Sequence, residues 1–276
     1  MNKNKVFSGL TLNWHFTRKC NMGCKYCFAS VGKELSRTER FSVLEKLKGT
    51  FERINFVGGE PTIHPDLIDL MIKAKEMGFK VTLVTNGYRM IKDPIFAERV
   101  LDIVDGIGIS VDSINEETNK KIGRCHCHQI ISKEEYVNLC KKIKKHNLPL
   151  KINTVVSKTN LEEDFSEFYS VVNPDRIKMF QVLVPNLPTK RDYSEFLISD
   201  EEYSVFVKKH QTKGYNIVAE SNELMIGAYF MLNAAGCFEN NEKGFESKCI
   251  LSNDMSVKKA LKEVDINMEK YMFRYV

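Results

Sequence analysis

The chain has 276 residues, 43% of them hydrophobic, so it is long enough to bury a sizeable core in one large domain. Its 41 basic and 36 acidic residues give a formal net charge of +5, a bias too weak to indicate a nucleic-acid partner. No apolar run reaches the length of a membrane span, and the chain begins with a short polar stretch, residues 1–5. Eight cysteines in such a sequence indicate reduced thiols, so we expect a cytoplasmic protein that binds neither nucleic acid nor membrane.

Six short runs rich in apolar, β-branched and aromatic residues recur along the chain, with helix-length segments between them. These predicted strands cover residues 11–16, 53–57, 80–85, 106–111, 150–156 and 176–182. Strands that alternate with helices indicate repeated βα units and a parallel sheet. The rhythm fits an α/β fold, either a partial barrel of six βα units or an open doubly wound sheet. It has too few repeats for an eight-fold barrel.

After residue 183 the βα rhythm weakens. Residues 184–188 are typical of a loop and residues 200–210 of a helix, and residues 220–222 are expected to introduce a helical segment that runs through Tyr229. Neither a low-complexity tract nor a long linker divides the chain. We therefore expect residues 1–183 to form the core and residues 184–276 to form an extension that closes the active site within the same globular unit.

Three cysteines, Cys20, Cys24 and Cys27, stand within eight residues just after the first predicted strand. A closed zinc site and an ordinary four-iron cluster each use four protein ligands, so a group of three indicates a cluster with one iron left open. A zinc loop with a distant fourth ligand, or three incidental thiols, are the alternatives. Residues 125–128 read Cys-His-Cys-His, but adjacent residues rarely direct all their side chains to one ion, so no metal is expected there.

Polar residues follow the next two predicted strands. Ligands of parallel sheets gather at the carboxyl ends of the strands, so these residues are expected near the cysteines. Gly58 and Gly59 allow the backbone to approach a ligand closely, and the carboxylate of Glu60 can bind an ammonium group. Asn86 and Gly87 follow the third strand, and such a pair is typical of a turn.

After the fourth predicted strand, Ser110 offers a hydroxyl group, and Arg124 can engage a carboxylate in bidentate fashion. The structural alternatives are a helix cap for the serine and an ordinary surface position for the arginine.

Four basic residues lie on or beside predicted strands: Arg53 at the second, Lys151 at the fifth, and Arg176 and Lys178 at the sixth. If these side chains face the interior, their charge is costly to bury without an anionic ligand, for which a triphosphate is a natural choice. Charge alone does not distinguish a triphosphate from a carboxylate or a phosphosugar, and solvent-facing charges remain the alternative.

The spacing C-x3-C-x2-C followed by an aromatic residue, together with Gly-Gly-Glu-Pro after the second strand, resembles the radical S-adenosylmethionine (SAM) enzymes. A longer series of blocks in the same order resembles one family among them, the prokaryotic type of viperin-like nucleotide dehydratase. The blocks are residues 13–20, 54–61, 110–113, 122–124, 151–153, 160–164, 173–181 and 220–222. The resemblance implies a partial (β/α)6 barrel with a C-terminal capping extension.

The resemblance also implies the cofactors and the reaction. A [4Fe-4S] cluster and SAM would generate a 5′-deoxyadenosyl radical, which removes the hydrogen at C4′ of CTP. The 3′-hydroxyl would leave as water, and a further electron and proton would give 3′-deoxy-3′,4′-didehydro-CTP, an antiviral chain terminator. UTP and GTP are alternative substrates.

Family roles carry over to fifteen positions of this sequence. The implied cluster ligands are Cys20, Cys24 and Cys27; the implied SAM contacts are Gly58, Gly59, Glu60, Asn86, Ser110 and Arg124; the implied nucleotide contacts are Asn13, Arg53, Lys151, Arg176 and Lys178; and the implied hydrogen donor is Tyr229. A core aromatic is the structural alternative for the tyrosine.

Two departures limit this transfer: Arg53 stands where the family has a lysine, and Val57 stands where it has a serine. The expected partners are a nucleoside triphosphate and an electron donor such as flavodoxin or ferredoxin, and the protein is expected to be a monomer. Another class of radical SAM enzyme and a non-catalytic zinc or nucleic-acid-binding module are the competing interpretations.

Overall fold

The computed structural model describes residues 10–28, 32–183, 192–211, 214–241 and 244–275. In these residues the strands form one sheet of ten, in the order β10-β9-β8-β1-β2-β3-β4-β5-β6-β7. The six central strands are parallel and follow the chain order. They are β1 (Thr11–Thr17), β2 (Arg53–Gly58), β3 (Lys80–Thr85), β4 (Gly106–Ser110), β5 (Leu150–Val156) and β6 (Arg176–Gln181).

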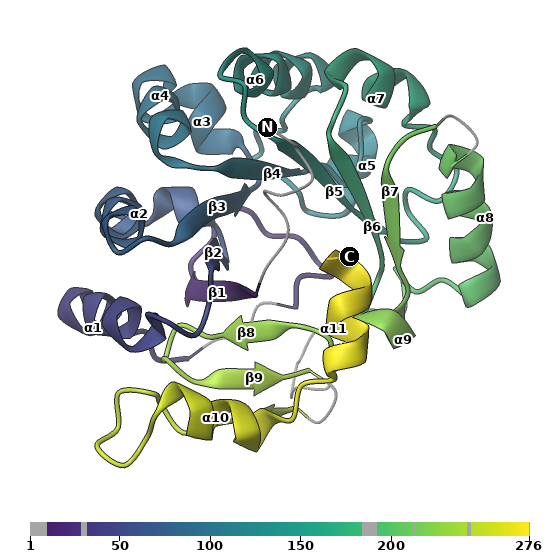
Figure 1. Cartoon of the computed structure of the whole chain (residues 1–276). Helices are drawn as coiled ribbons and strands as arrows, with labels where there is room; N and C mark the ends of the chain where they lie inside the picture. Colours follow the sequence, from purple (N-terminus) through teal and green to yellow (C-terminus); the bar gives the residue numbers. More distant parts are fainter. Residues whose placement is uncertain (1–9, 29–31, 184–191, 212–213, 242–243, 276) are drawn as a thin grey trace.

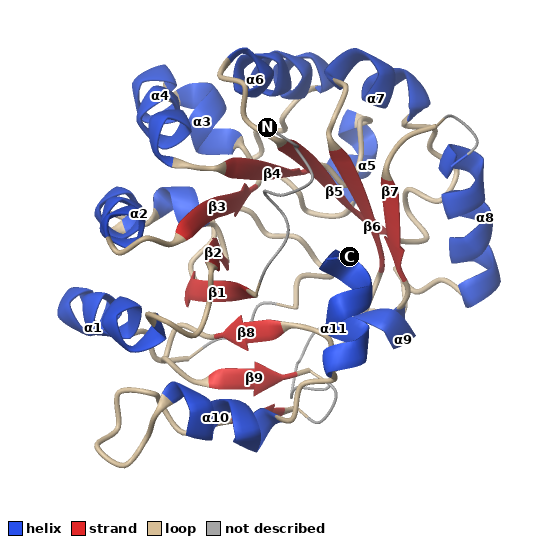
Figure 2. Cartoon of the chain, viewed as in Figure 1, coloured by secondary structure: helices blue, strands red, loops and turns tan. Residues whose placement is uncertain are grey.

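The predicted parallel sheet of six βα units is confirmed, and the predicted strands coincide with β1 to β6. Figure 1 shows these strands curving around an interior, and Figure 2 shows helices along the outside of the curve. The helices between the strands are α1 (Arg37–Leu47), the 3-10 turn η2 (Pro61–Ile63), α2 (Leu67–Glu76), α3 (Tyr88–Lys92), α4 (Pro94–Ile103), α5 (Glu116–Lys121), α6 (Lys133–Lys145) and α7 (Ser166–Val172). The curved sheet is therefore an open, partial barrel.

Because side chains alternate along each strand, the sheet has an apolar face toward the helices and a polar face toward the interior. In β1, Leu12, Trp14 and Phe16 are fully buried in the core, whereas Asn13 and His15 line an interior cavity. Successive residues of a strand point to opposite faces, so one strand serves both surfaces. The sheet thus packs on its helices and keeps polar groups for the interior.

The chain after residue 183 extends both edges of the six-stranded core. Its strands are β7 (Ile217–Glu220), which pairs with β6, and β8 (Phe230–Leu232), which pairs with β1 and is followed by β9 (Phe238–Asn240) and β10 (Phe245–Glu246). Its helices are α8 (Asp200–Gln211), α9 (Asn222–Met225), α10 (Val257–Val264) and α11 (Met268–Tyr275). Only a cap was expected from this part of the sequence, and the four strands were not predicted. The loop expected at residues 184–188 lies outside the described residues.

The predicted helix through Tyr229 is wrong. Ser221 caps α9 by accepting a hydrogen bond from the backbone NH of Leu224, but the helix ends at Met225. Gly227 then takes a left-handed conformation (φ 71°), which stops the helix and turns the chain into β8. Tyr229 accordingly lies on the connection just before β8.

Helix α11 is tied to the start of the central sheet. The hydroxyl of Tyr271 accepts a hydrogen bond from the backbone NH of Thr11 at 2.6 Å, and its ring packs on Phe230 with 4.9 Å between ring centres. The C-terminal helix therefore closes the amino-terminal end of β1. Within the described ranges, the helices are all too short or too polar to cross a bilayer.

Candidate active site

A cavity of about 420 Å³ occupies the interior of the curved sheet, and all the site residues expected from the sequence line it. They are Asn13, Cys20, Cys24, Cys27, Arg53, Gly58, Gly59, Glu60, Asn86, Ser110, Arg124, Lys151, Arg176, Lys178 and Tyr229. The structure thus brings together residues from β1 to β6 and from the C-terminal extension.

The cavity has two chemically different ends. The cysteines, Glu60 and Ser110 lie at or just beyond the carboxyl ends of their strands, as expected. Arg53 and Arg176 are instead the first residues of β2 and β6. A strand rises about 3.3 Å per residue, so a six-residue strand separates its two ends by roughly 16 Å. The cations therefore lie at the end of the cavity opposite to the cysteine loop.

The Gly-Gly-Glu-Pro motif is hydrogen-bonded to the segment that leads from β1 into the cysteine loop. The backbone NH of Gly59 donates to the carbonyl of Thr17, and the NH of Glu60 donates to the carbonyl of Lys19, both at 2.8 Å. A Cβ at Gly59 would lie 2.2 Å from the carbonyl oxygen of Lys19. The glycine was expected to admit a ligand, but its visible role is to let two backbones touch.

A second backbone contact fixes the other side of the cysteine loop. The NH of Gly23 donates to the carbonyl of Gly123 at 3.2 Å, and the NH of Lys25 donates to the carbonyl of Ile122 at 2.9 Å. Gly123 is left-handed (φ 76°), and a Cβ there would lie 2.5 Å from the carbonyl oxygen of Gly23. The loop is therefore held between the end of β2 and the segment after α5.

The three thiols suit an iron–sulfur cluster better than a single ion. Among the described residues, no fourth cysteine lines the cavity, and no three His, Cys, Asp or Glu side chains are close enough to hold one metal ion. Burial raises the pKa of the Cys24 thiol to about 12, and Arg124, whose Nη1 lies 3.9 Å from Cys24 Sγ, acts in the opposite direction. Thiolates here need cationic partners, as iron would provide.

Glu60 is a buried carboxylate surrounded by donors. Its Oε1 accepts hydrogen bonds from the backbone NH and hydroxyl of Thr62, at 3.0 and 2.5 Å, and from the hydroxyl of Thr85 at 2.6 Å. Its Oε2 accepts from the backbone NH of Asn86 at 2.7 Å. Burial raises the pKa of Glu60, and these donors lower it. An ammonium group beside Oε2 would stabilise the ionised form further, which fits the predicted contact with SAM.

Arg124 is already engaged by the protein. Its Nη1 pairs with Asp112 Oδ2 at 2.6 Å, and its Nη2 donates to the carbonyl of Ser110 at 2.6 Å. Burial opposes the charge, but Asp112, Tyr136, Cys24 and Tyr26 together outweigh burial and raise the pKa of Arg124 well above its ordinary value. The bidentate grip expected on a ligand carboxylate is thus used on Asp112 and Ser110, and the contact of Arg124 with SAM stays a prediction.

The basic end of the cavity concentrates charge on neighbouring strands. Lys151 stands opposite Arg176 on β5 and β6, and it also faces Gly108 on β4. A Cβ at Gly108 would lie 2.8 Å from Lys151 Cε, so the glycine makes room for the lysine. Burial, then the charges of Lys178 and Arg176, lower the pKa of Lys151 to about 7. An anion would relieve this repulsion.

A row of polar side chains crosses the cavity between its two ends. Asn13 Oδ1 accepts from Asn55 Nδ2 at 2.8 Å, and Asn55 Oδ1 accepts from the hydroxyl of Thr82 at 3.0 Å. These residues are register partners on β1, β2 and β3. Asn13 was expected in the site, whereas the other two were missed.

Other lining residues were also missed by sequence reasoning, although strand alternation carries their signal. His15 shares the inner face of β1 with Asn13, and burial with the nearby Arg18 lowers its pKa to about 4. Asn153 shares the inner face of β5 with Lys151, and Glu239 of β9 also lines the cavity. No sequence pattern pointed to Glu239, because the three-residue strand β9 is too short to show the alternation of side chains that is typical of a strand.

The segment at residues 125–128 forms a turn beside the cysteine loop. His126 and Gln129 form a bridge around Cys127 and His128, and Nδ1 of His126 lies 2.9 Å from the carbonyl oxygen of Asn21. This contact supports the cysteine loop.

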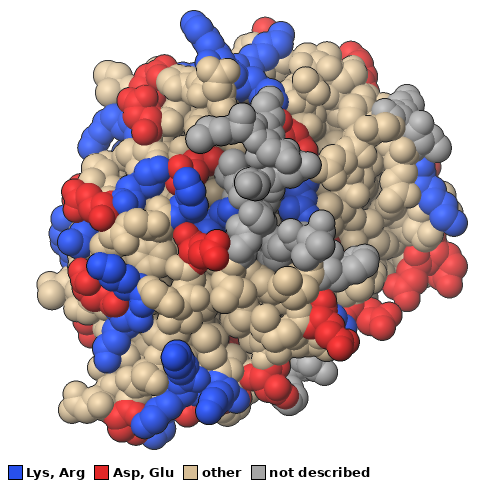
Figure 3. All heavy atoms as spheres, viewed as in Figure 1, with Lys and Arg blue, Asp and Glu red and all other residues tan. Residues whose placement is uncertain are grey.

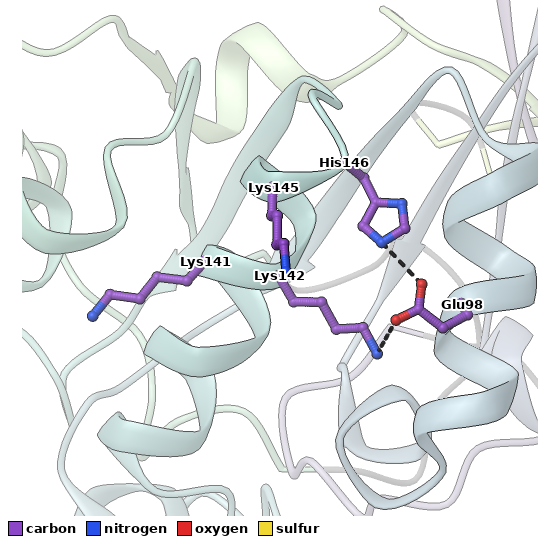
Figure 4. A pocket seen from close by; sticks show the side chains of 5 residues that line it. All are labelled: Glu98, Lys141, Lys142, Lys145 and His146. Atoms are coloured by element: carbon purple, nitrogen blue, oxygen red, sulfur yellow. Dashed lines mark ion pairs between the residues drawn. The ribbon is translucent and has the colours of Figure 1, made fainter.

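A second hollow, of about 600 Å³, lies on the outside of α4 and α6 (Figure 4). Lys142 and His146 converge on Glu98, each at 2.9 Å, while Lys141 points away from it. Basic and acidic side chains are also mixed over the face seen in Figure 3. Lys142 and His146 therefore share one carboxylate on the outer surface of the helices.

Comparisons with known proteins agree with the site. The family model described as "Radical SAM superfamily" matches residues 14–172. The chain is 36% identical to the "S-adenosylmethionine-dependent nucleotide dehydratase" of Flammeovirga pacifica, over 98% of this chain and 97% of that one. It is 33% identical to the "S-adenosylmethionine-dependent nucleotide dehydratase RSAD2" of Danio rerio, over 96% of this chain and 76% of that one.

The fold resembles the solved structure of native anSMEcpe with bound AdoMet. The TM-score is 0.67 at 17% identity, and the likeness covers 96% of this chain and 82% of that one. From the family match and the sequence identities, we conclude that the chain belongs to the radical SAM superfamily and, within it, to the viperin-like S-adenosylmethionine-dependent nucleotide dehydratases.

Proposed function

We propose that this radical SAM nucleotide dehydratase acts on a nucleoside triphosphate, with CTP preferred, and converts it to 3′-deoxy-3′,4′-didehydro-CTP, an antiviral chain terminator. The observation that carries the proposal is a single cavity with three cysteines at one end and four basic side chains at the other. UTP and GTP are the alternative substrates.

The basic end suits the triphosphate. Arg53, Lys151, Arg176 and Lys178 line it, and the lowered pKa of Lys151 means that an anion is favoured there. Phosphate groups bound at this end direct the ribose along the strands toward the cysteine loop. Asn13 and Asn55 then lie at the depth of the sugar, where their amides can hold its hydroxyl groups.

The chemistry divides between the cofactors and the chain. When bound, the [4Fe-4S] cluster and SAM supply a 5′-deoxyadenosyl radical that takes the C4′ hydrogen of the sugar. In our proposal Cys20, Cys24 and Cys27 hold the cluster, while Gly58, Gly59, Glu60, Asn86, Ser110 and Arg124 surround SAM. All of these residues line the cavity.

Tyr229 completes the reaction in this proposal. Its O–H bond breaks, its electron goes to the nucleotide radical, and its proton goes to the departing 3′-hydroxide, which leaves as water. One electron from the donor protein and one proton from solvent then restore the phenol. The side chain lines the cavity from the C-terminal extension, which supports our proposal that this extension closes the active site.

The carboxylate of Glu239 favours a substrate whose base carries an amino group. Met231 of β8 pairs with Asn13 on one side and with Glu239 on the other, so Glu239 lies in the same row across the sheet as the proposed sugar contact. Its carboxylate lines the cavity and can accept a hydrogen bond from the N4 amino group of cytosine, which uracil lacks.

The remaining partners also belong to the proposal. Cys20 is exposed, so a small flavodoxin or ferredoxin can approach the cluster. We place the enzyme in the cytoplasm as a monomer, which agrees with reduced thiols.

The test uses anaerobically reconstituted protein with SAM, dithionite and each nucleoside triphosphate in turn. We expect about four irons per chain. CTP should stimulate 5′-deoxyadenosine formation, and its product should be lighter than CTP by the mass of one water. Equal 5′-deoxyadenosine formation with every nucleotide, and no dehydrated product, would contradict the proposal.

A further inference from the structure

Glu220 is a buried carboxylate to which the proposed reaction gives no role. It ends β7, is 1% exposed, and faces two proposed site residues. One oxygen forms an ion pair with Nζ of Lys178, and the other accepts a hydrogen bond from the hydroxyl of Tyr229. Lys178 Nζ and the Tyr229 hydroxyl are 3.1 Å apart, so the three groups form a closed triangle.

The triangle stands at the wall of the nucleotide cavity. Lys178 and Tyr229 line the cavity, whereas Glu220 is not among the described lining residues. The pairing of β6 with β7 places Glu220 opposite Phe180, whose ring centre lies 5.0 Å from Lys178 Nζ. Glu220 therefore contacts the lining groups and acts through them.

Charge explains why this carboxylate is present at the basic end. Glu220 opposes the shift in the pKa of Lys151 that Lys178 and Arg176 help to cause. A buried ion pair that is also hydrogen-bonded holds both partners in place, and removing one partner leaves a buried charge uncompensated. Lys178 is thus fixed before a nucleotide arrives, and the phenol of Tyr229 is fixed with it.

We infer that Glu220 is a positioning residue, whose carboxylate sets the hydroxyl of Tyr229 at the place where the nucleotide radical forms. The inference rests on the proposed function, in particular on hydrogen donation by Tyr229. It adds no chemical step, because the carboxylate only orients its neighbours. A displacement of about 1 Å in such a group can cost on the order of 100-fold in rate.

The test measures the ratio of dehydrated CTP to 5′-deoxyadenosine in reconstituted enzyme. In Glu220→Ala the ratio should fall at least about tenfold, to the level of Tyr229→Phe, while 5′-deoxyadenosine formation stays within about threefold of the unaltered enzyme. The Glu220→Ala/Tyr229→Phe double variant should be no lower than Tyr229→Phe alone, because both changes remove one function. The KM for CTP should rise more in Lys178→Met than in Glu220→Ala, because Glu220 affects nucleotide binding only through Lys178.

Two further variants keep the outcomes distinct. Glu220→Gln retains the shape of the side chain and one acceptor oxygen, so it tests the inference if Glu220→Ala does not fold. Its ratio of dehydrated CTP to 5′-deoxyadenosine should lie between that of Glu220→Ala and that of the unaltered enzyme. Glu223→Ala, an exposed carboxylate nearby, should leave the ratio unchanged. An unchanged ratio with both products reduced in Glu220→Ala and Glu220→Gln, or a further fall in the double variant, would overturn the inference. Absence of dehydrated CTP with the unaltered enzyme would instead reject the proposed function.

Discussion

Lys151 and Arg176 stand directly opposite each other on β5 and β6, and both side chains line the cavity. Like charges that face each other across strands repel. Burial, with the repulsion from Lys178 and Arg176, lowers the pKa of Lys151 to about 7, well below its ordinary value of 10.5. The protonated lysine therefore opposes folding of the ligand-free protein and favours binding of an anion.

The first prediction concerns pH. Between about pH 7 and 10.5 the unfolded chain binds more protons at Lys151 than the folded chain, so this group makes stability rise with pH in that window. Binding of inorganic triphosphate has the opposite trend, because the anion favours the charged lysine. Its affinity, measured by calorimetry, should fall as pH rises through 7. Lys151→Met should remove this contribution to the pH dependence of triphosphate affinity. Identical pH profiles for Lys151→Met and the unaltered protein would refute the prediction.

The second prediction concerns Gly59. In Gly59→Ala the new Cβ would meet the Lys19 carbonyl oxygen at 2.2 Å, so the cysteine loop must move. Overpacking of this kind costs about 1–3 kcal/mol, and we expect the iron content after reconstitution to fall markedly. Gly23→Ala is a matched control in the same loop, because its Cβ would meet only the Gly123 carbonyl oxygen, at 3.8 Å. Equal iron contents in both variants would argue against tight packing.

The third prediction compares two ion pairs. Asp112 and Arg124 are both buried, so Asp112→Asn should lower the free energy of unfolding by about 3 kcal/mol in urea. Asp69 pairs with Arg37 at an exposed position, and Asp69→Asn should lower the free energy of unfolding far less than Asp112→Asn does. If the free energy of unfolding fell equally in the two variants, burial would not decide how strongly an ion pair stabilises this protein.

The fourth prediction concerns the base. Glu239→Gln turns one acceptor oxygen into a donor, which can pair with O4 of uracil. The ratio of kcat/KM for CTP to that for UTP should fall by about tenfold, at 1.4 kcal/mol per factor of ten. The steady-state measurement should show no change in SAM cleavage without nucleotide. An unchanged ratio would place the base elsewhere.

The central strands could be predicted because each is a run of five to seven residues that is rich in apolar, β-branched or aromatic side chains. The strands β7 to β10 could not, since they have only two to four residues and depend on pairing with distant strands. The helix predicted through Tyr229 failed because Gly227 was not recognised as its stop.

The site was predictable where motifs follow strand ends, as at Cys20 and Glu60. The inward direction of Lys151 follows from its alternation with Leu150 and Ile152, which are buried. The triangle of Lys178, Glu220 and Tyr229 has no local pattern, because its members come from separate elements. Family membership decides against the alternatives of another radical SAM class and of a non-catalytic zinc or nucleic-acid-binding module.

The strands β7 and β8 cover the two open sides of the parallel core, and both belong to the last third of the chain. A ribosome therefore releases the core strands with two unsatisfied hydrogen-bonding edges, which are sites for aggregation until β7 and β8 have been made. The strand edges of the core are therefore exposed in the nascent chain and covered in the folded protein.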